Sequence, residues 1–401
     1  MALSSRGAAM RHRAGALRVV IVGGGIGGAG AANALLQHGL EVKVYEQASA
    51  LTEVGAGVAI QPNGLRVLQR LGFDNDIVRY GALWADAQQL RANGAFIFQQ
   101  ARGIEFYGMH RADLLGMLVD RLPAEIIETD HRCVGFAQDD EQATVIFANG
   151  ASVSADVVVG ADGIHSALQP YVVAPTAPIS SGAMAYRGVL PAASVDWPAG
   201  VMRNWLGAGK RFMVYPVRAN ELVNYVGFVP TDEQLKESWS APGDPAALAA
   251  EFAGWDPLVE AILAQVTTCF RWGLYDREPL PRWSRGRLTL LGDAAHPMLP
   301  HAGQGVNQAL EDGLALATIL AQADRASVPE ALRIYESVRR ERTAGVQAMS
   351  RTNRGYYEAS SDLDRRDREL GRQLGDRIWI WNYDAEAEAQ AALVAVCHHS
   401  S

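Results

Sequence analysis

A glycine-rich loop between a β-branched strand and an alanine-rich helix constrains this chain more than any other feature. Residues 18–22 (RVVIV) predict a short buried strand, the loop GGGIGG follows at 23–28, and an alanine- and leucine-rich helix is expected to end near Gly39. A second strand is predicted at 42–46 (VKVYE), so the segment forms a βαβ unit. Such a unit begins a parallel sheet covered by helices, and we expect an α/β fold.

The loop satisfies the pattern GxGxxG, and Glu46 ends the second strand 18 residues beyond Gly28. Gly23 permits a tight turn, Gly25 lets the backbone approach a pyrophosphate at the helix N-terminus, and Gly28 allows the helix to pack on the strand. Glu46 is placed to accept a hydrogen bond from a ribose hydroxyl. These residues predict a dinucleotide site but do not distinguish FAD from NAD. The loop alone is also compatible with an ordinary glycine turn.

Length and charge limit the other possibilities. A chain of 401 residues favours two domains. With 36 Lys and Arg against 44 Asp and Glu, the net charge is −8 and no basic stripe forms, so nucleic acid is not an expected partner. No run approaches the ~20 apolar residues of a membrane span, and the first 16 residues, read as a loose tail, lack the apolar core of a secretory signal.

The three cysteines are Cys133, Cys269 and Cys397, which are widely spaced and form no CxxC pair. They predict neither a disulfide framework nor a zinc site, and no metal is expected. A reducing, cytoplasmic setting is the expectation.

Further elements follow from local patterns. Residues 144–153 predict a hairpin closed by an Asn-Gly turn, and a buried strand is expected at 155–159. Another core strand is predicted at 288–291, and an amphipathic helix is expected to begin near Val306.

Two long regions differ in character. Residues 178–276 alternate apolar and polar positions and predict a mostly β region, interrupted by a helical stretch at 245–265. Residues 325–372 are charged and predicted helical, and the aromatic residues Trp379, Trp381 and Tyr383 are expected to fold back onto the body.

Two more glycine motifs follow predicted buried strands: GADG at 160–163 and GDAAHP at 292–297. With GxGxxG near the start, their order and spacing resemble the FAD-dependent aromatic hydroxylases related to p-hydroxybenzoate hydroxylase, over roughly residues 17–350. The stretch WGLYDREPL at 272–280 and the loop around His301 are similar to those of salicylate and 6-hydroxynicotinate hydroxylases.

The resemblance implies an α/β protein with a discontinuous Rossmann-like FAD-binding domain, a mostly β substrate domain and a helical C-terminal region. The expected boundaries are a disordered tail at 1–16, an FAD-binding domain at 17–80, 106–177 and 277–345, a substrate domain at 81–105 and 178–276, and a C-terminal helical segment at 346–401.

The resemblance also assigns cofactor contacts. Asp293 is expected to hydrogen-bond the flavin ribityl chain, and Asp162 belongs to the motif that serves both FAD and the nicotinamide cofactor. Arg111 matches the family arginine that approaches FAD, although a surface arginine paired with Asp113 is the alternative. Gln169 stands where the family usually has an arginine, which leaves the nicotinamide contact on that side open.

The loop PHAGQG at 300–305, with Gly303 and Gly305, precedes the helix expected near Val306. Backbone N–H groups at a helix start favour negative charge. In the family this helix points at the flavin N1 and C2 carbonyl, where the reduced flavin is negative.

The activity implied is that of a single-component monooxygenase with noncovalent FAD, NADH or NADPH, and molecular oxygen. It would hydroxylate a small hydroxylated aromatic or heteroaromatic acid through a C4a-hydroperoxyflavin, with or without decarboxylation, in aromatic catabolism. A monomer or homodimer is expected. The rival functions are an FAD-dependent reductase or oxidase of the same superfamily, and a flavin-binding interaction protein without turnover.

Ionising the substrate's ring hydroxyl requires a base, and His301 and Tyr215 are the candidates. His301 could instead cap the helix start, and Tyr215 could be a core tyrosine. Arg211 would grip a substrate carboxylate if it points inward. A solvated arginine beside Lys210 is the alternative.

Overall fold

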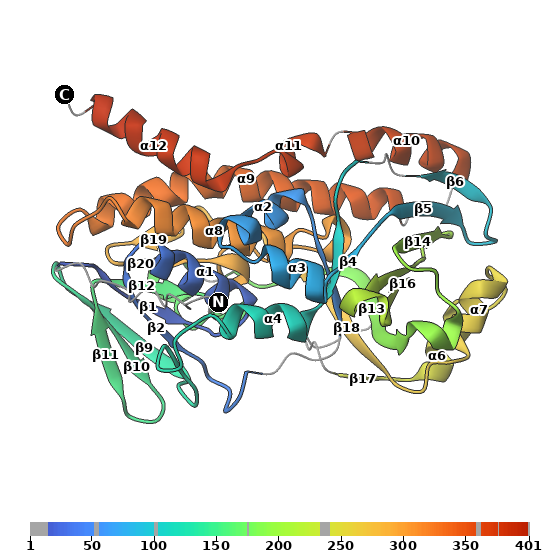
Figure 1. Cartoon of the computed structure of the whole chain (residues 1–401), viewed down its shortest axis with the longest axis horizontal. Helices are drawn as coiled ribbons and strands as arrows, with labels where there is room; N and C mark the ends of the chain where they lie inside the picture. The colour runs from blue at the N-terminus through green and yellow to red at the C-terminus, as the bar shows by residue number, and fades with distance from the viewer. Residues whose placement is uncertain are drawn as a thin grey trace, which may run out of the picture.

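The predicted βαβ unit begins a six-stranded sheet (Figure 1). Its strand order is β19-β20-β12-β1-β2-β8, and all neighbours are parallel except β19 and β20. Apolar, β-branched runs bury its central strands on both faces, which is typical of parallel sheets. The strands are β1 (Arg18–Val22), β2 (Glu41–Tyr45), β8 (Ile127–Glu128), β12 (Val157–Gly160), β19 (Ser284–Arg285) and β20 (Leu288–Leu290).

The computed structural model describes residues 15–51, 56–99, 103–174, 176–232, 241–357, 362–375 and 377–399. All but the last two residues of the predicted tail at 1–16 lie outside these ranges.

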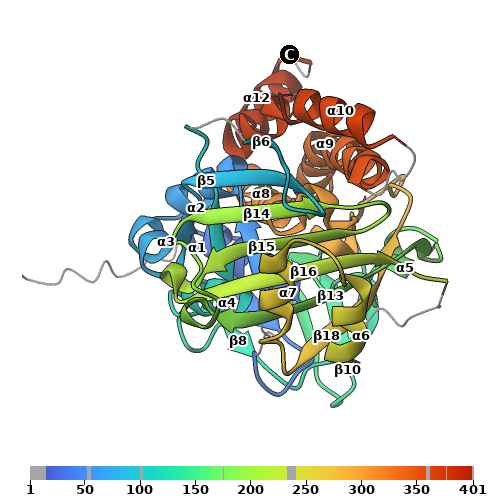
Figure 2. The ribbon, with the colours of Figure 1, turned by 90° about the vertical axis from the view of Figure 1, so that its right-hand side faces the viewer.

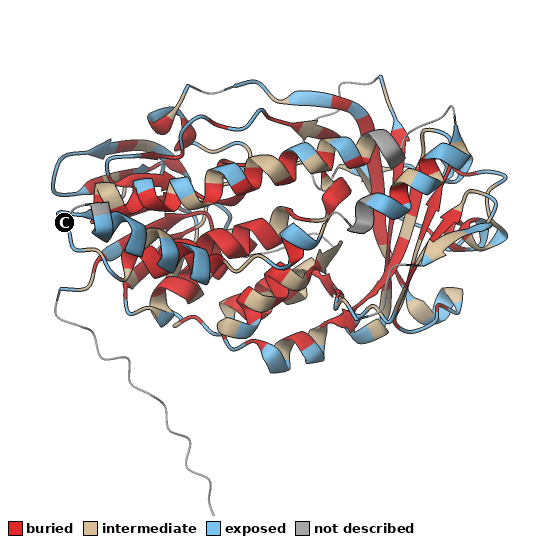
Figure 3. Ribbon diagram, turned by 90° about the horizontal axis from the view of Figure 1, so that it is seen from above, coloured by how far each residue is buried: buried red, intermediate tan, exposed pale blue. Residues whose placement is uncertain are grey.

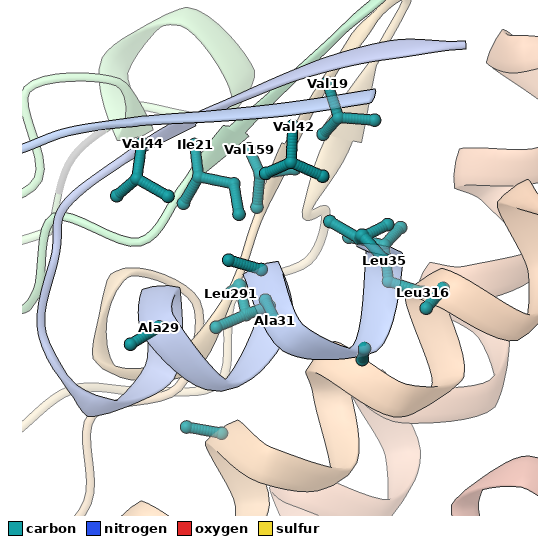
Figure 4. Packing of buried hydrophobic residues seen from close by; sticks show 14 of the residues in the cluster. Val19, Ile21, Ala29, Ala31, Leu35, Val42, Val44, Val159, Leu291 and Leu316 are labelled. Carbon is teal, nitrogen blue, oxygen red and sulfur yellow. The ribbon is translucent and has the colours of Figure 1, made fainter. Parts of the chain in front are cut away.

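Helices α1 (Ile26–Gln37) and α8 (Gly305–Leu320) cover one face of the sheet (Figure 4). Their backbones approach so closely that a Cβ on Gly313 would lie 2.8 Å from the Cα of Ala31. Small residues at this contact therefore allow α8 to run deep in the protein, with its N-terminus beside the first glycine loop.

A separate three-stranded antiparallel sheet contains β9 (Cys133–Gln138), β10 (Ala143–Phe147) and β11 (Ser152–Ala155). The predicted hairpin is confirmed, because β10 pairs with β11 and Gly150 in the turn has a φ of +88°. A second three-stranded sheet contains β3 (Gly57–Ile60), β4 (Ala82–Leu83) and β7 (Tyr107–His110). The helices of the same part of the chain are α2 (Pro62–Arg70), α3 (Asp74–Tyr80) and α4 (Arg111–Val119), whereas α5 (Gln169–Val172) contacts β19 and β20.

The region predicted to be mostly β forms an eight-stranded sheet, seen face-on in Figure 2, in the order β17-β18-β13-β16-β15-β14-β5-β6. The strands are β5 (Asp86–Arg91), β6 (Phe96–Gln99), β13 (Ile179–Pro191), β14 (Val201–Leu206), β15 (Arg211–Val217), β16 (Leu222–Pro230), β17 (Pro242–Gly243) and β18 (Cys269–Asp276).

The two faces of this sheet have different partners. Helices α6 (Pro245–Glu251) and α7 (Pro257–Leu263) lie on the outer face and pack on residues such as Phe212. Alternate residues of the same strand, Met213 and Tyr215, line a cavity on the inner face. Strand alternation thus separates the core of the sheet from its functional surface.

The C-terminal region is helical and lies along the top of both halves (Figure 1). It consists of α9 (Val328–Tyr357), α10 (Leu363–Gly375), α11 (Ile378–Trp381) and α12 (Ala385–His399). Viewed from above, the long helices have buried residues on one side and exposed residues on the other (Figure 3). Trp381 is buried as expected, whereas Trp379 is 45% exposed. None of the described helices combines the length and apolarity that crossing a membrane requires.

Candidate active site

The loop after β1 has the conformation that GxGxxG predicts. Gly23 has a φ of +111°, and a Cβ on Gly28 would lie 1.9 Å from the carbonyl oxygen of Gly23. A Cβ on Gly25 would meet no atom within 4 Å, because Gly25 faces a large cavity. Two of the glycines are therefore required to build the loop, while Gly25 leaves room for a ligand to approach the backbone.

The carboxylate of Glu46 holds this loop from the second strand. Its Oε2 accepts a 2.7 Å hydrogen bond from the backbone N–H of Gly24, and its Oε1 accepts one of 2.8 Å from Ala48. Glu46 is not among the residues that line the cavity. It fixes the shape of the turn, and its predicted bond to a ribose hydroxyl stays a prediction.

The GADG loop follows β12 and contributes Ala161 and Gly163 to the cavity lining. The side chain of Asp162 turns away, and its Oδ2 accepts a 2.7 Å hydrogen bond from the N–H of Ala167. Burial raises the pKa of Asp162, although a hydrogen bond with Ser166 opposes the shift. In this structure Asp162 orders the loop whose backbone faces the cavity.

Gln169, the residue found in place of the expected arginine, is buried at the start of α5. Its Nε2 donates a 3.2 Å hydrogen bond to the carbonyl oxygen of Ala294, in the GDAAHP motif. The glutamine thus connects two of the three glycine motifs.

The GDAAHP motif turns sharply after β20, where Gly292 has a φ of +62°. Asp293 reaches the cavity from this turn. Its side chain is exposed within the cavity, and the protein that surrounds it raises the pKa of its carboxyl, although the charges of His296 and Arg111 oppose the shift.

The histidine of the same motif attaches the loop to α8. His296 Nε2 lies 2.6 Å from Asp312 Oδ2, and the N–H of Gly292 donates to the same oxygen at 3.0 Å. Asp312 Oδ1 accepts a 2.7 Å bond from Arg339 Nε on α9. Desolvation opposes ionisation of Asp312, but the charges of His296 and Arg339 lower its pKa to about 2.

The N-terminus of α8 also faces the cavity, with Gly303 and Gly305 among the lining residues. Gly303 has a φ of +63°, and its carbonyl oxygen accepts bonds from Gln61 Nε2 at 3.0 Å and Asn307 Nδ2 at 2.9 Å. These side chains hold the loop carbonyl away from the helix start. The exposed N-terminus favours a negatively charged ligand group.

The cavity has a volume of about 360 Å³, within the ~300–1,000 Å³ range of ligand pockets. The three glycine motifs and the start of α8 form one side of it. The eight-stranded sheet forms the other side, which contains Arg187, Met213, Tyr215, Asn224, Val226, Phe228 and Trp272.

Arg111 and Tyr215 both line this cavity, as the sequence led us to expect. Asp113, the alternative partner expected for Arg111, accepts hydrogen bonds of 2.8 and 2.6 Å from Arg218. Burial raises the pKa of Tyr215 above its usual value, although the charges of Arg187 and Arg111 oppose the shift. Tyr215 is therefore a neutral phenol at physiological pH.

Arg187 is a lining residue that the sequence analysis missed. It lies on β13, is 4% exposed, and holds its guanidinium 4.8 Å from the ring centre of Trp272. The sequence signal for Arg187 was a single arginine within the apolar run GAMAYRGVLP. A charged side chain in a buried strand indicates a partner or a function.

His301 and Arg211 are not cavity-lining residues. Both pack on Phe228, which does line the cavity, at 5.3 Å between ring centres for His301 and 4.0 Å from the Arg211 guanidinium. Arg211 is 4% exposed, so the alternative of a solvated arginine is wrong. Burial lowers the pKa of His301 well below 6.5, and the charges of Arg211 and Arg354 lower it further.

Comparisons with known proteins agree with this geometry. A family described as "FAD binding domain" matches residues 16–350. A 3-amino-4-hydroxybenzoate 2-monooxygenase, PtmB3 of Streptomyces platensis, is 36% identical over 92% of this chain and 96% of its own. The chain belongs to the FAD-dependent aromatic monooxygenases.

Two other relatives of the monooxygenase support the same assignment. The 6-hydroxynicotinate 3-monooxygenase of Bordetella bronchiseptica is 34% identical over 84% of this chain and 91% of its own. A solved structure described as a salicylate hydroxylase substrate complex has a TM-score of 0.83 and 30% identity, covering 95% of this chain and 98% of the other. The predicted family, fold class and enzyme class are thereby confirmed.

The cavity of the monooxygenase fits FAD. The space beside Gly25 is open, the Asp293 carboxyl reaches the cavity, and the start of α8 faces it. These features suit a pyrophosphate, a polyol chain and a negatively charged ring, respectively. The monooxygenase uses FAD together with a nicotinamide cosubstrate.

Proposed function

We propose that this monooxygenase hydroxylates a small aromatic or heteroaromatic acid that carries a ring hydroxyl. The observation that carries the proposal is Arg187, a buried cation on the sheet side of the cavity. A guanidinium binds a carboxylate through two parallel hydrogen bonds, and a buried site strengthens them.

The relatives support an acid as substrate. By their names, they act on 3-amino-4-hydroxybenzoate, 6-hydroxynicotinate and salicylate. Each of these molecules is a single ring with a carboxylate and a hydroxyl group. A cavity with one buried arginine and a neutral tyrosine matches those two groups.

Bound FAD supplies the electron transfer from the nicotinamide and the activation of oxygen. We propose that Asp293 binds the ribityl chain, that Arg111 approaches the flavin, and that the backbone at Gly303 and Gly305 stabilises its negative charge. Gly23, Gly25 and Gly28 would hold the pyrophosphate. Their loops are ordered by Glu46 and Asp162.

On the substrate side, we assign Arg187 to the carboxylate and Tyr215 to the ring hydroxyl. Tyr215 keeps its proton at neutral pH, so it can donate a hydrogen bond to the ionised ring oxygen. The nearby positive charge of Arg187 favours that ionised form. We give His301 and Arg211 a supporting role, since both pack on Phe228 and His301 stays neutral.

The cellular setting is part of the proposal. We propose a cytoplasmic enzyme that acts as a monomer or homodimer. Cys133 and Cys269 are buried free thiols, as a reducing compartment favours.

A substrate screen tests the proposal. The FAD-loaded protein is mixed with NADH or NADPH and with 3-amino-4-hydroxybenzoate, 6-hydroxynicotinate or salicylate, and nicotinamide oxidation and oxygen uptake are recorded. We expect an acid to stimulate both and to yield a product whose mass reports added oxygen or loss of the carboxylate. Oxidation that no acid stimulates, with only hydrogen peroxide as product, would contradict the proposal.

A further inference from the structure

A second hollow adjoins the active-site cavity. It has a volume of about 280 Å³ and lies where the start of β13 and the end of β18 meet the C-terminal half of α9. Leu299 lines both spaces. One apolar side chain therefore forms a shared wall between the hollow and the cavity.

An irregularity in the sheet shapes the hollow. The pairing of β13 with β18 shifts between Ser180 and Met184, and Gly182 within this bulge has a φ of +68°. Bulges next to active sites redirect side chains and end regular pairing. Here the bulge places Ile179 and Ser181 on the wall of the hollow, with Ile179 50% exposed at its rim.

The hollow contains a buried polar group suited to a ligand. Ser181 is 7% exposed, and its hydroxyl has no hydrogen-bond partner within the described part of the chain. Buried polar groups are rarely left without a partner in proteins, so a hydroxyl of this kind is expected to meet water or a ligand.

The charges around the hollow are balanced and therefore admit an anion. Its two acidic residues, Asp276 and Glu278, are both bound by Arg351, with Glu278 at 3.0 Å from Arg351 Nη1. Arg354 also lines the hollow, so the arginines and acids balance and no excess negative charge remains to repel a carboxylate.

Positive charge continues from the hollow to the cavity. Arg354 lines the hollow, and its charge and that of Arg211 both reach His301, two residues beyond Leu299. Arg187 then provides the cation inside the cavity. Arginine side chains therefore lie on both sides of the wall formed by Leu299.

Bound FAD would limit the paths into the cavity. FAD held by the glycine motifs would occupy the side of the cavity that they form, which leaves the substrate side to be reached by another path. We propose that the hollow is the route by which the aromatic acid reaches the sheet side of the cavity, and that Leu299 is its gate. This inference rests on the proposed function, because it takes an aromatic carboxylate as the ligand.

A blocking substitution tests the route. Ile179→Trp places a large side chain at the rim of the hollow, at a residue that does not itself line the active-site cavity. Ile146→Trp is the matched control, because Ile146 is 42% exposed on β10 of the separate hairpin sheet. Binding is followed in the oxidised, FAD-loaded protein by stopped-flow flavin absorbance. The probe is whichever of 3-amino-4-hydroxybenzoate, 6-hydroxynicotinate and salicylate binds the parent most tightly.

A gated route has a kinetic signature. Ile179→Trp should slow association and dissociation by the same factor, about tenfold within the one-to-three-decade range of such mutants, and leave the Kd nearly unchanged. Ile146→Trp should change neither rate. Arg354→Gln should slow association and reduce its dependence on salt.

Other results would overturn the route alone or the proposed function together with it. Unchanged rates in Ile179→Trp would overturn the route, and so would a weaker Kd that arises from dissociation alone, since that result describes a binding contact. If the parent binds none of the three acids, the proposed function fails and the route fails with it. If the parent binds and turns over an acid but Ile179→Trp has parent rates, only the route is lost.

Discussion

The indole N–H of Trp381 donates a 2.9 Å hydrogen bond to Oε1 of Gln61, a residue 320 positions earlier in the chain. Gln304 Nε2 donates to the same oxygen at 2.7 Å. The amide nitrogen of Gln61 donates in turn to the carbonyl oxygens of Ala302 and Gly303, at 2.8 and 3.0 Å. The C-terminal helix α11 thus fixes the backbone at the start of α8.

Replacing Trp381 by Phe should weaken FAD binding. The change removes one donor but keeps a ring to pack on Phe106, so the loop at Gly303 loses one of its restraints. A hydrogen bond contributes about 0.5–1.5 kcal/mol, which corresponds to a roughly 2- to 13-fold higher Kd. Fluorescence titration of the apoprotein with FAD measures this. Trp379→Phe, at a residue 45% exposed, is the control, and equal losses in the two variants would contradict the assignment.

We predict that the carboxylate of Asp293 strengthens FAD binding but lowers the free energy of unfolding of the apoprotein. The pKa of this carboxyl is raised by the surrounding protein, so its contribution to folding is present below the unfolded value of 3.8 and is lost as the pH rises through the folded pKa. Asp293→Asn should therefore make the apoprotein more resistant to urea at pH 8, with the gain shrinking toward pH 4. Asp293→Ala should weaken FAD binding roughly 10- to 150-fold, since a hydrogen bond to a charged group contributes about 1.5–3 kcal/mol.

Asp139 provides the contrasting control for this experiment. Hydrogen bonds from the backbone at Gln142 and Glu141 lower its pKa, so its contribution is present at neutral pH and is lost in acid. Asp139→Asn should shift the urea midpoint in the opposite direction at pH 8. Shifts of the same sign in both aspartates would refute the electrostatic explanation.

His301 should make the fold sensitive to mild acid. The pKa of His301 is lowered in the folded state, so His301 stays neutral there while the unfolded state takes up a proton below pH 6.5. Its contribution to the free energy of unfolding is therefore complete above pH 6.5 and is lost as the pH falls below that value. Between pH 7.5 and 5.5 this amounts to a free energy on the order of 1 kcal/mol. His301→Asn should reduce the loss of unfolding free energy over that interval by this amount. His165→Asn is the control, because this histidine is exposed, and it should leave the pH dependence unchanged. Identical pH profiles for His301→Asn and the parent would rule the effect out.

Arg187 should determine affinity for the carboxylate of the substrate. Arg187→Gln is expected to raise the Kd of the acid roughly 10- to 150-fold, the range for a hydrogen bond to a charged group, while FAD binding stays close to that of the parent. An analogue without the carboxylate should lose little affinity. Arg203→Gln is the control, since Arg203 lies on β14 and binds Gln88 outside the cavity lining. An equal loss for the acid and its neutral analogue would show that Arg187 does not bind the carboxylate.

Features that depend on neighbouring residues could be predicted from the sequence. The strand–loop–helix around Gly25 and the Asn-Gly hairpin are local, so spacing and residue type specify them. Strand alternation also predicts the burial of Arg211. Arg211 and Tyr215 are four residues apart on β15 and share a face, so a Tyr215 that faces the ring requires Arg211 to be buried.

Features that depend on contacts between distant residues could not be predicted from the sequence. His301 packs on Phe228, and no local pattern specifies which way a ring points from a single 3-10 turn. Gln61 acquires its role from residues more than 240 positions away. Arg187 could have been found from its apolar surroundings in the sequence, but its position over the cavity depends on the pairing of β13 with β16 and β18.

The order of strands in the six-stranded sheet also bears on how the chain is made. β20 pairs with β12, and α8, which packs on α1, ends at residue 320 of 401. A nascent chain emerging from the ribosome therefore exposes an unpaired edge of β12 while six of the eight strands of the larger sheet, β13 to β18, are made, and an uncovered face of α1 for longer still. Unpaired edges and bare apolar faces are the surfaces that aggregate and that chaperones bind. Because Asp293 and the start of α8 belong to this late segment, FAD can stabilise the fold only after the segment has been translated.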